Sequence, residues 1–207
     1  MTVATRTDET IRRDLIGALA ACVAQKGYAS TTISDVVALA RVSKRTFYEH
    51  FSGKEDCLLA LYAHVTGRLM NIIRAAGGAD QRFQLQIAAG TKAFLSALDS
   101  MPEFTRTLLV EMQGAGPRAF RMRQETLRGF ARTIVDLVEV GRAANPEIKP
   151  LAMPRALAIV GGINELLLHA IDPYAGPSTV DGVFSALYDD VVSLITALLL
   201  YDGSAPM

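Results

Sequence analysis

The chain has only two cysteines and three histidines among its 207 residues. Two cysteines are too few for a disulfide framework, and their spacing from the histidines is not that of a zinc site. We therefore expect no disulfide, no metal and no other cofactor. Cys22 and Cys57 each lie in an apolar helical pattern, which predicts two buried thiols in a reducing cytoplasm, with a redox switch as the alternative.

The sequence also has no excess of either charge and no long apolar run. Its 21 Lys and Arg residues balance 21 Asp and Glu residues, 50% of the residues are hydrophobic and 20% are charged. This composition predicts a well-buried globular protein and argues against a disordered one. No apolar run approaches the roughly 20 residues that a membrane span needs. We expect a cytoplasmic protein that does not contact a membrane.

A stretch near the N-terminus imitates an export signal, because Arg12-Arg13 precedes an apolar run. Asp14, however, interrupts the transition from the arginines to the apolar run, and apolar residues recur through this segment every four positions: Ile11, Leu15, Leu19 and Val23. Such a stripe is typical of an amphipathic helix. We predict a first helix over about residues 8–26, after a flexible tail at residues 1–7.

The next segment carries the signals of two short helices joined by a tight turn. Gly27 ends the first helix of the chain, and Thr32 with Asp35 forms a capping box for the second. Ser43 is placed to cap a third helix, predicted over residues 44–51. The short connection between the second and third helices is typical of a helix-turn-helix.

The third helix turns basic and polar residues outward. Phe47 and Phe51 are spaced four apart towards the core, which leaves these residues outside: Lys44, Arg45, Tyr48 and Glu49. Between Arg41 and Lys54 the basic residues exceed the acidic one by 4 − 1 = +3, although the whole chain is neutral. A compact basic patch of this kind indicates a polyanionic partner, which we interpret as DNA.

The same segment carries further residues at fixed spacings: Ala40, Val42 and Ser43 at the turn, then Thr46, Phe47, Tyr48, Glu49, His50, Phe51 and Lys54. Over about residues 8–65 the chain thereby resembles the TetR family of bacterial transcriptional regulators. The resemblance implies an all-α fold of about nine helices. It implies a helix-turn-helix DNA-binding domain at residues 8–68, with the motif at about 31–50, and a helical effector-binding and dimerisation domain at residues 69–207.

Two residues of this segment depart from the family pattern. Arg41 stands where the family often has glycine, at a turn that favours positive φ, so we expect some backbone strain there. Val37 stands where alanine is common, at the close contact between the second and third helices. The angle between these helices is therefore expected to differ a little from that of the family.

We expect the DNA contacts to come from one set of residues: Thr32, Arg41, Ser43, Lys44, Arg45, Thr46, Tyr48, His50 and Lys54. The planar fork of Arg45 suits guanine O6 and N7, a pairing worth about 1–3 kcal/mol of discrimination between bases. The resemblance implies phosphate contacts for Tyr48, His50 and Lys54. The residues at helix N-termini either cap the helix or bind phosphate, and both roles can coexist.

The rest of the chain predicts further helices over the ranges 54–76, 83–98, 102–110, 118–144, 154–171 and 180–201. Residues 83–87 alternate like a strand, but the longer apolar spacing that runs on to Leu98 favours a helix. No partner strand is evident elsewhere in the sequence. Glycine and proline residues at 114–117 predict a loop before the long helix that follows.

The last two helices are apolar on more than one side, which is typical of a helix that meets a partner. A helix-turn-helix normally reads DNA as a pair, so we predict a homodimer seam, with burial inside the monomer as the alternative. The predicted seam residues are Leu157, Val160, Leu167, Leu168, Phe184, Leu187, Val191, Leu194 and Leu198.

Four polar residues lie within or beside apolar stretches, and a small ligand would supply hydrogen-bond partners for them: Glu111, Gln113, Asn164 and His169. Bonding to the backbone or exposure to solvent is the alternative for each.

No catalytic constellation is present, so we do not expect an enzyme. The sequence predicts a repressor that binds a palindromic operator as a homodimer and is released by a small-molecule effector. An effector-independent dimeric regulator is the alternative, and a helical enzyme is a further one.

Overall fold

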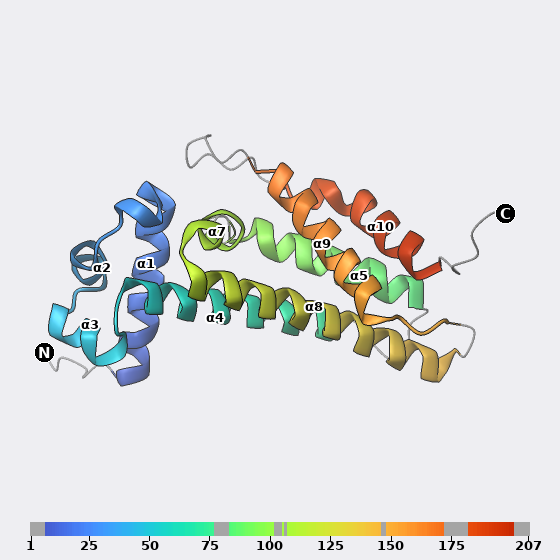
Figure 1. Ribbon diagram of the computed structural model, residues 1–207, viewed down its shortest axis with the longest axis horizontal. Helices are drawn as coiled ribbons and strands as arrows, with labels where there is room; N and C mark the ends of the chain where they lie inside the picture. Colours follow the sequence, from blue (N-terminus) through green and yellow to red (C-terminus); the bar gives the residue numbers. More distant parts are fainter. Residues whose placement is uncertain are drawn as a thin grey trace, which may run out of the picture. The chain divides into compact units, whose positions relative to one another are not determined.

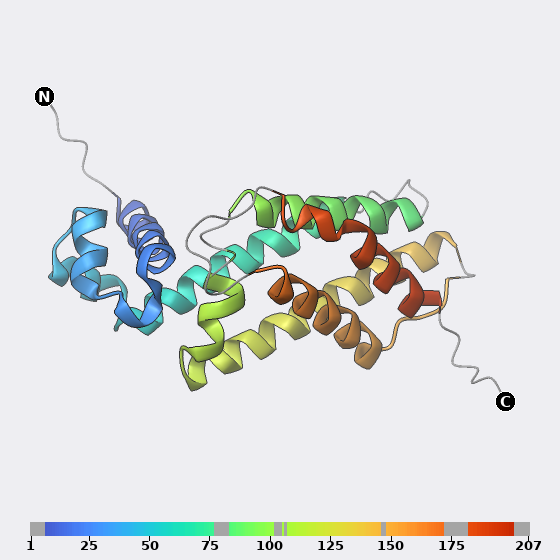
Figure 2. The same cartoon turned by 90° about the horizontal axis from the view of Figure 1, so that it is seen from above.

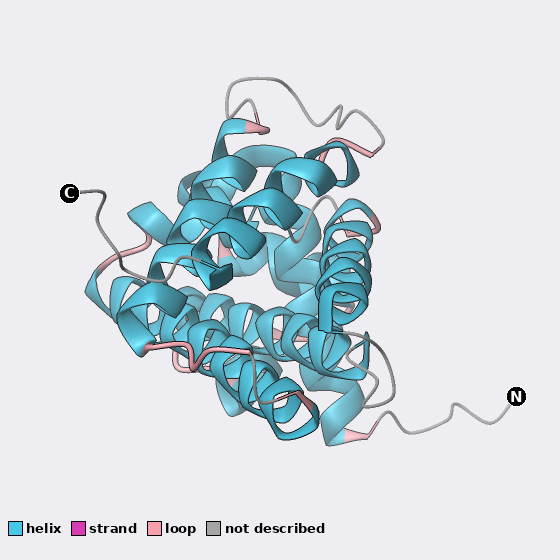
Figure 3. Ribbon diagram, turned by 90° about the vertical axis from the view of Figure 1, so that its right-hand side faces the viewer, coloured by secondary structure: helices cyan, strands magenta, loops and turns pink. Residues whose placement is uncertain are grey.

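The structure is a computed structural model, and it describes residues 7–76, 83–101, 105, 107–145, 148–171 and 182–200. These residues form helices joined by turns and loops, without a strand (Figure 3). The helices are α1 (Asp8–Ser30), α2 (Ile33–Ala40), α3 (Lys44–His50), α4 (Lys54–Ala76), α5 (Phe83–Asp99), η1 (Thr107–Glu111), α7 (Met112–Gly114), α8 (Pro117–Ala144), α9 (Met153–His169), η2 (Ser185–Leu187) and α10 (Tyr188–Leu200). The predicted all-α class is confirmed. Within the described residues, no helix is long and apolar enough to cross a membrane.

The chain divides by its contacts into two units. The first contains Met1–Val65 together with Glu103–Met122, and the second contains Thr66–Pro102 together with Arg123–Met207. The sequence placed everything after residue 68 in one body, whereas the contacts assign the segment around η1 and α7 to the N-terminal unit. How function is divided between the units remains a prediction.

Local signals set the ends of α1. The Thr7 side chain accepts a hydrogen bond from the Thr10 backbone N–H at 3.2 Å, which caps the helix as expected. Gly27 adopts φ 76° and ψ 160°, so the regular helix ends there although one more turn of hydrogen bonds runs to Ser30. Only glycine takes this backbone conformation at low cost. The predicted stop at Gly27 is confirmed.

The core of the first unit is formed by the apolar faces of α1 to α4. Phe47 is fully buried and Phe51 is 3% exposed, as their spacing predicted. Cys57 is fully buried too, and burial raises the pKa of its thiol to about 12, while burial also raises the pKa of Cys22. Both cysteines are free, so the prediction of two buried thiols is confirmed. Fully buried neighbours in this core include Leu15, Leu19, Val36, Leu58 and Leu61.

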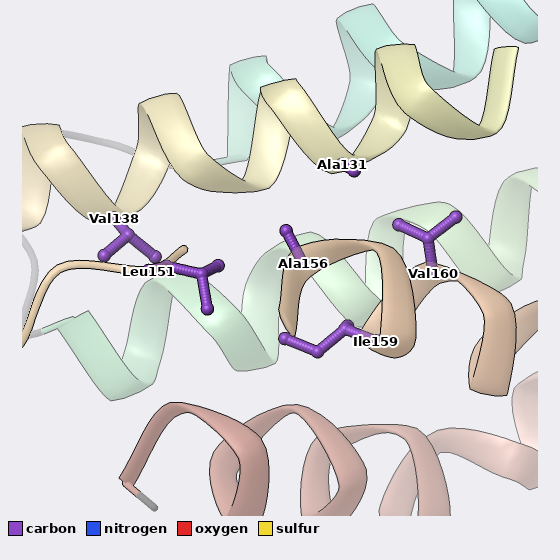
Figure 4. Close-up of a cluster of buried hydrophobic side chains, with 6 residues drawn as sticks. All are labelled: Ala131, Val138, Leu151, Ala156, Ile159 and Val160. Atoms are coloured by element: carbon purple, nitrogen blue, oxygen red, sulfur yellow. The ribbon is translucent and has the colours of Figure 1, made fainter. Parts of the chain in front are cut away.

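The second unit is built around α9, which runs between α8 and α10 (Figure 1), while α5 lies beside α10 (Figure 2). Ala131 on α8 faces Ala156 and Val160 on α9 (Figure 4). Packing against this cluster are partly buried residues of α10: Ile195, Leu198 and Leu199. Gly162 of α9 faces Leu194, because a Cβ there would lie 2.9 Å from a Leu194 methyl carbon. The prediction of a helix, and not a strand, over residues 83–98 is confirmed by α5.

Two predicted helices differ from the structure. Of the short helix expected over 102–110, residues 107–110 lie in the π-helix η1, which leads directly into α7 and so shortens the expected loop at 114–117, while residues 102–104 and 106 lie outside the described residues. A π-turn holds more residues than an α-turn, which a 3.6-residue pattern cannot predict. The last helix begins with the 3₁₀ turn η2, where Asp99 accepts the backbone N–H groups of Phe184 and Ser185 at 3.0 and 2.9 Å. Pro102, Val180 and Tyr201, where predicted helices began or ended, lie outside the described residues.

Candidate nucleic-acid interface

The capping box of α2 is formed as the sequence predicted. The Asp35 backbone N–H donates to Thr32 Oγ1 at 3.3 Å, and Thr32 N–H donates to Asp35 Oδ2 at 2.7 Å. Lys26 Nζ lies 2.7 Å from the same carboxylate oxygen. The hydrogen bonds from Lys26 and Thr32 hold the pKa of Asp35 well below its usual range. The start of α2 is therefore held by a charged network that reaches back to α1.

The turn between α2 and α3 is held by Arg41 and Ser43. Arg41 adopts the left-handed conformation with φ 55° and ψ 49°, which confirms the positive φ expected there, and its side chain is exposed. The Ser43 side chain accepts the Thr46 backbone N–H at 3.0 Å and caps α3. The hydroxyls of Ser43 and Thr46 are also hydrogen-bonded to each other at 2.9 Å.

The outer face of α3 presents polar and aromatic groups to solvent. Lys44 is exposed, and the side chain of Arg45 is 90% exposed, with its Nε 3.2 Å from Glu49 Oε1. Tyr48 is 58% exposed and packs edge-on against the buried Phe47 ring, with centroids 5.6 Å apart. Phe47 thus anchors the helix, and the opposite face carries groups able to bind base edges and phosphates.

His50 and Lys54 have more partners inside the protein than the sequence suggested. The His50 side chain is only 6% exposed, and its Nε2 lies 3.5 Å from Asp8 Oδ1. Lys54 Nζ donates to the carbonyls of Tyr28 and Thr31, both at 2.7 Å, and lies 4.2 Å from the centre of the Tyr28 ring. Burial lowers the pKa of Lys54, an effect that the charge of Glu111 opposes. The Lys54 ammonium therefore ties the end of α1 to the start of α4.

The four predicted ligand-pocket residues fall in different units. Glu111 is half-buried, and its Oε1 lies 3.6 Å from where a Cβ on Gly27 would stand. Gln113 is exposed and donates to the Leu109 carbonyl at 2.8 Å. Both belong to the first unit, whereas half-buried Asn164 and 80%-exposed His169 belong to the second. The backbone partner of Gln113 and the exposure of His169 match the alternative given for these residues.

The predicted seam residues divide into two groups by burial. Four are buried within the chain itself: Val160, Leu167, Phe184 and Val191. Five are half-buried: Leu157, Leu168, Leu187, Leu194 and Leu198. The buried four are unavailable to a second copy unless the fold opens, because their side chains already pack in the second unit. The seam itself remains a prediction.

Sequence reasoning missed the contacts of two arginines in the first unit. Arg118 pairs with Glu55 and Asp56 at 3.3 and 3.1 Å, and the Arg12 guanidinium lies 5.1 Å from the centre of the Phe51 ring. Neither pairing leaves a local signal, because each joins residues far apart in the sequence. In the sequence, Arg12 has the position of an export-signal arginine, and this pattern does not indicate a contact with Phe51.

The geometry defines a class of protein. Two short helices meet at a tight turn, both are capped, and the second presents exposed Lys44, Arg45 and Tyr48 on a firmly anchored face. This is a helix-turn-helix, the element with which many transcriptional regulators read the major groove.

Comparison with known proteins agrees with this class. Residues 15–61 match the family described as bacterial regulatory proteins, tetR family. The uncharacterized HTH-type transcriptional regulator YxbF of Bacillus subtilis is 30% identical over 98 residues, which are 47% of this chain and 25% of that relative. The matched part of the chain thus spans about a quarter of that relative's length.

Solved structures share the fold at low sequence identity. The fatty acid degradation regulator FadR of Bacillus halodurans has a TM-score of 0.76 at 19% identity, covering 94% of this chain and 97% of that one. FadR of Bacillus subtilis, solved in complex with stearoyl-CoA, has a TM-score of 0.74 at 18% identity, covering 91% and 97%. The predicted resemblance to the TetR family is confirmed over residues 15–61, and the solved structures share the fold of the chain.

Proposed function

We propose that this protein is a homodimeric repressor that binds a palindromic operator and releases it when a small molecule binds in the helical body. The observation that carries the proposal is the exposed face of α3, where Lys44, Arg45 and Tyr48 surround the buried anchor Phe47. The proposal gives α3 the role of recognition helix, lying in the major groove with its first residues nearest the base edges.

Arg45 is the residue we assign to base recognition. Its side chain is 90% exposed and held by Glu49 at 3.2 Å. An exposed pair within one helix is worth about 0.3–0.5 kcal/mol, whereas a bidentate contact with guanine is worth about 1–3 kcal/mol. The free energy gained by contacting guanine exceeds the free energy lost when the pair with Glu49 breaks. We therefore expect Arg45 to exchange Glu49 for a base when the protein binds DNA. Tyr48 and Lys44, further around the same face, suit phosphates.

A second copy is required for a site of useful length. One recognition helix reads only a few base pairs, and paired helices read half-sites about 34–36 Å apart. The half-buried leucines of α9, η2 and α10 are the apolar surface that we assign to the seam, in particular Leu168 of α9 and Leu187 of η2. Analytical ultracentrifugation of the protein alone tests this part of the proposal, since a monomer at micromolar concentration contradicts it.

The effector we propose is a long-chain acyl compound. The similar fold of Bacillus subtilis FadR was solved with stearoyl-CoA, and the second unit of this chain has an apolar core formed by side chains of α8, α9 and α10. An acyl chain suits such an interior because transfer of each methylene from water is favourable by about 0.8 kcal/mol. The rival proposal is a regulator with no effector, whose body serves dimerisation alone.

A gel-shift experiment tests DNA binding. Duplexes are selected from a random-sequence pool by the wild-type protein, and the DNA upstream of its own coding sequence is tested beside them. Arg45→Ala is expected to weaken binding of the selected duplex about 5- to 150-fold, the equivalent of 1–3 kcal/mol, and Tyr48→Phe to weaken it less. Arg132→Ala, which removes an exposed arginine of α8 in the other unit, is the matched control. If Arg45→Ala and Tyr48→Phe both bind like wild type, the assignment of α3 as the recognition helix is wrong.

A thermal-shift screen tests the effector. A ligand at about 100 times its Kd adds roughly 2.7 kcal/mol to native stability. Stearoyl-CoA, stearate and free CoA are compared, and the compound that stabilises the protein is added to the gel shift. Stabilisation together with release of DNA supports the proposed repressor. DNA binding that no acyl compound alters, with no thermal shift, favours the effector-independent regulator.

A further inference from the structure

The first turns of α1 lie against the C-terminal end of α3. Asp8 Oδ1 lies 3.5 Å from Nε2 of His50, the last residue of α3. One turn further along α1, the Arg12 guanidinium lies over the ring of Phe51, which follows His50 and ends the helix, at 5.1 Å from the centroid. Figure 1 shows this end of α1 beside α3. Two separate contacts therefore place Arg12 at the end of the recognition helix.

Among the described residues Arg12 has no acidic partner, whereas several cations around the motif are bound within the protein. Lys26 is paired with Asp35 at 2.7 Å, Arg45 with Glu49 at 3.2 Å, and Lys54 is bound by backbone carbonyls. Arg12 is exposed, and its described contact is with an aromatic ring. The neighbouring acid Asp8 is directed to His50.

A guanidinium held over an aromatic ring can still bind an anion. The ring engages none of its hydrogen-bond donors in a conventional hydrogen bond, so the five N–H donors along the edge of the group stay available in their fixed fork. A phosphate is bound by that edge, often through two parallel hydrogen bonds. Because Phe51 is 3% exposed and belongs to the core, it forms a rigid support for the cation.

The position of Arg12 matches a phosphate at the edge of the major groove. A helix of seven residues such as α3 is about 10 Å long, and the groove is about 12 Å wide. Lys44 lies at the start of α3 and Arg12 beside its end, so a cation stands at each end of the reading helix. We propose that Arg12, outside the helix-turn-helix itself, binds a backbone phosphate and thereby fixes how α3 docks in the groove. This inference rests on the proposed DNA binding.

Two measurements distinguish phosphate binding by Arg12 from a purely structural role: the base preference of the lost affinity and its dependence on salt. A phosphate contact positions the protein but carries no base preference, so Arg12→Gln lowers affinity alike for selected and unrelated duplexes. Loss of one phosphate contact also reduces the slope of log K against log salt by about 0.9. Between about 50 and 200 mM salt, the wild type then loses about 3.5-fold more affinity than the variant does. Damage to the fold would lower affinity without changing that slope.

The test is a KCl titration by fluorescence anisotropy, with duplexes selected by the wild-type protein. Arg13→Gln is the matched control, because it removes the same charge from the next exposed residue of α1. Arg12→Lys keeps the charge and is expected to retain the wild-type slope at somewhat lower affinity, and melting curves show that each variant is folded. An unchanged slope for Arg12→Gln, or an equal reduction for Arg13→Gln, overturns the assignment of Arg12 alone. A wild-type protein that binds no duplex overturns the proposed function, and this inference with it.

Discussion

Arg118 and Asp56 lie 62 residues apart in the sequence, yet Arg118 Nη2 is 3.1 Å from Asp56 Oδ1. The other arm of the guanidinium, Nη1, is 3.3 Å from Glu55 Oε2. Asp56 in turn accepts the Ser52 backbone N–H at 3.2 Å and its hydroxyl at 3.1 Å. The first turn of α8 is thereby joined to the first turn of α4, which follows α3 in the chain. This network is one reason why residues 103–122 belong to the N-terminal unit.

Replacing Arg118 is expected to lower the free energy of unfolding only modestly. The Arg118 side chain is 50% exposed and that of Asp56 35%, so solvent screens both ion pairs. We expect Arg118→Ala to lower the midpoint of urea denaturation only slightly. Arg121→Ala, at an exposed arginine one turn further along α8, is the control and should cost less. Equal effects of the two substitutions would contradict a stabilising role for the network.

The contribution of Asp56 to stability should depend on pH. The hydrogen bonds from the Ser52 backbone and hydroxyl and the one from Arg118 lower the pKa of Asp56 below its ordinary value of 3.8. A carboxyl whose pKa is lower in the folded state stabilises the fold above its unfolded pKa, and that stabilisation is lost as pH falls through the folded pKa. Asp56→Asn should therefore be less stable than wild type at about pH 7, and the difference should shrink as pH falls below 3.8. Urea denaturation at several pH values measures this difference, and a pH-independent difference would contradict it.

Two substitutions of Arg41 distinguish the effect of backbone strain on stability from the effect of a DNA contact on affinity. Arg41 is the non-glycine residue with positive φ, 55°, among those that the structure describes. The left-handed conformation costs a non-glycine residue roughly 1–2 kcal/mol, so Arg41→Gly should raise the free energy of unfolding by about 1 kcal/mol. Arg41→Ala keeps the strain and should not stabilise the protein. If Arg41 also contacts DNA, both variants lose the same affinity in the gel shift, whereas their stabilities differ.

Two glycine-to-alanine substitutions should have opposite effects on stability. A Cβ on Gly141 would lie 2.7 and 3.1 Å from two carbons of the Phe83 ring, so Gly141→Ala is expected to cost about 1–3 kcal/mol by overpacking. Gly17, in the middle of α1, has no atom within 4 Å of the same position. Gly17→Ala should therefore stabilise the protein by up to about 1 kcal/mol, because alanine favours the helix. Thermal unfolding measures both, and a stabilising Gly141→Ala would show that α5 and α8 are further apart.

The sequence by itself determined the elements whose causes are local. The caps of Thr32 and Ser43, the stop at Gly27 and the inward spacing of Phe47 each depend on residues within one or two turns of the chain. Such short-range hydrogen bonds and apolar spacings leave a readable pattern. For the same reason the outward face of α3, and with it the class of protein, followed from the printed residues.

Only the tertiary structure decided the partners that join distant segments. Lys54 was predicted to face phosphate, but the break at Gly27 exposes carbonyls 23 and 26 residues away that bind its ammonium. Phe184 and Val191 were predicted to meet a second copy, but they are buried within the second unit. The apolar pattern of a helix shows how much surface must be covered, not which neighbour covers it. That choice depends on how all the helices pack, and no single stretch of sequence contains it.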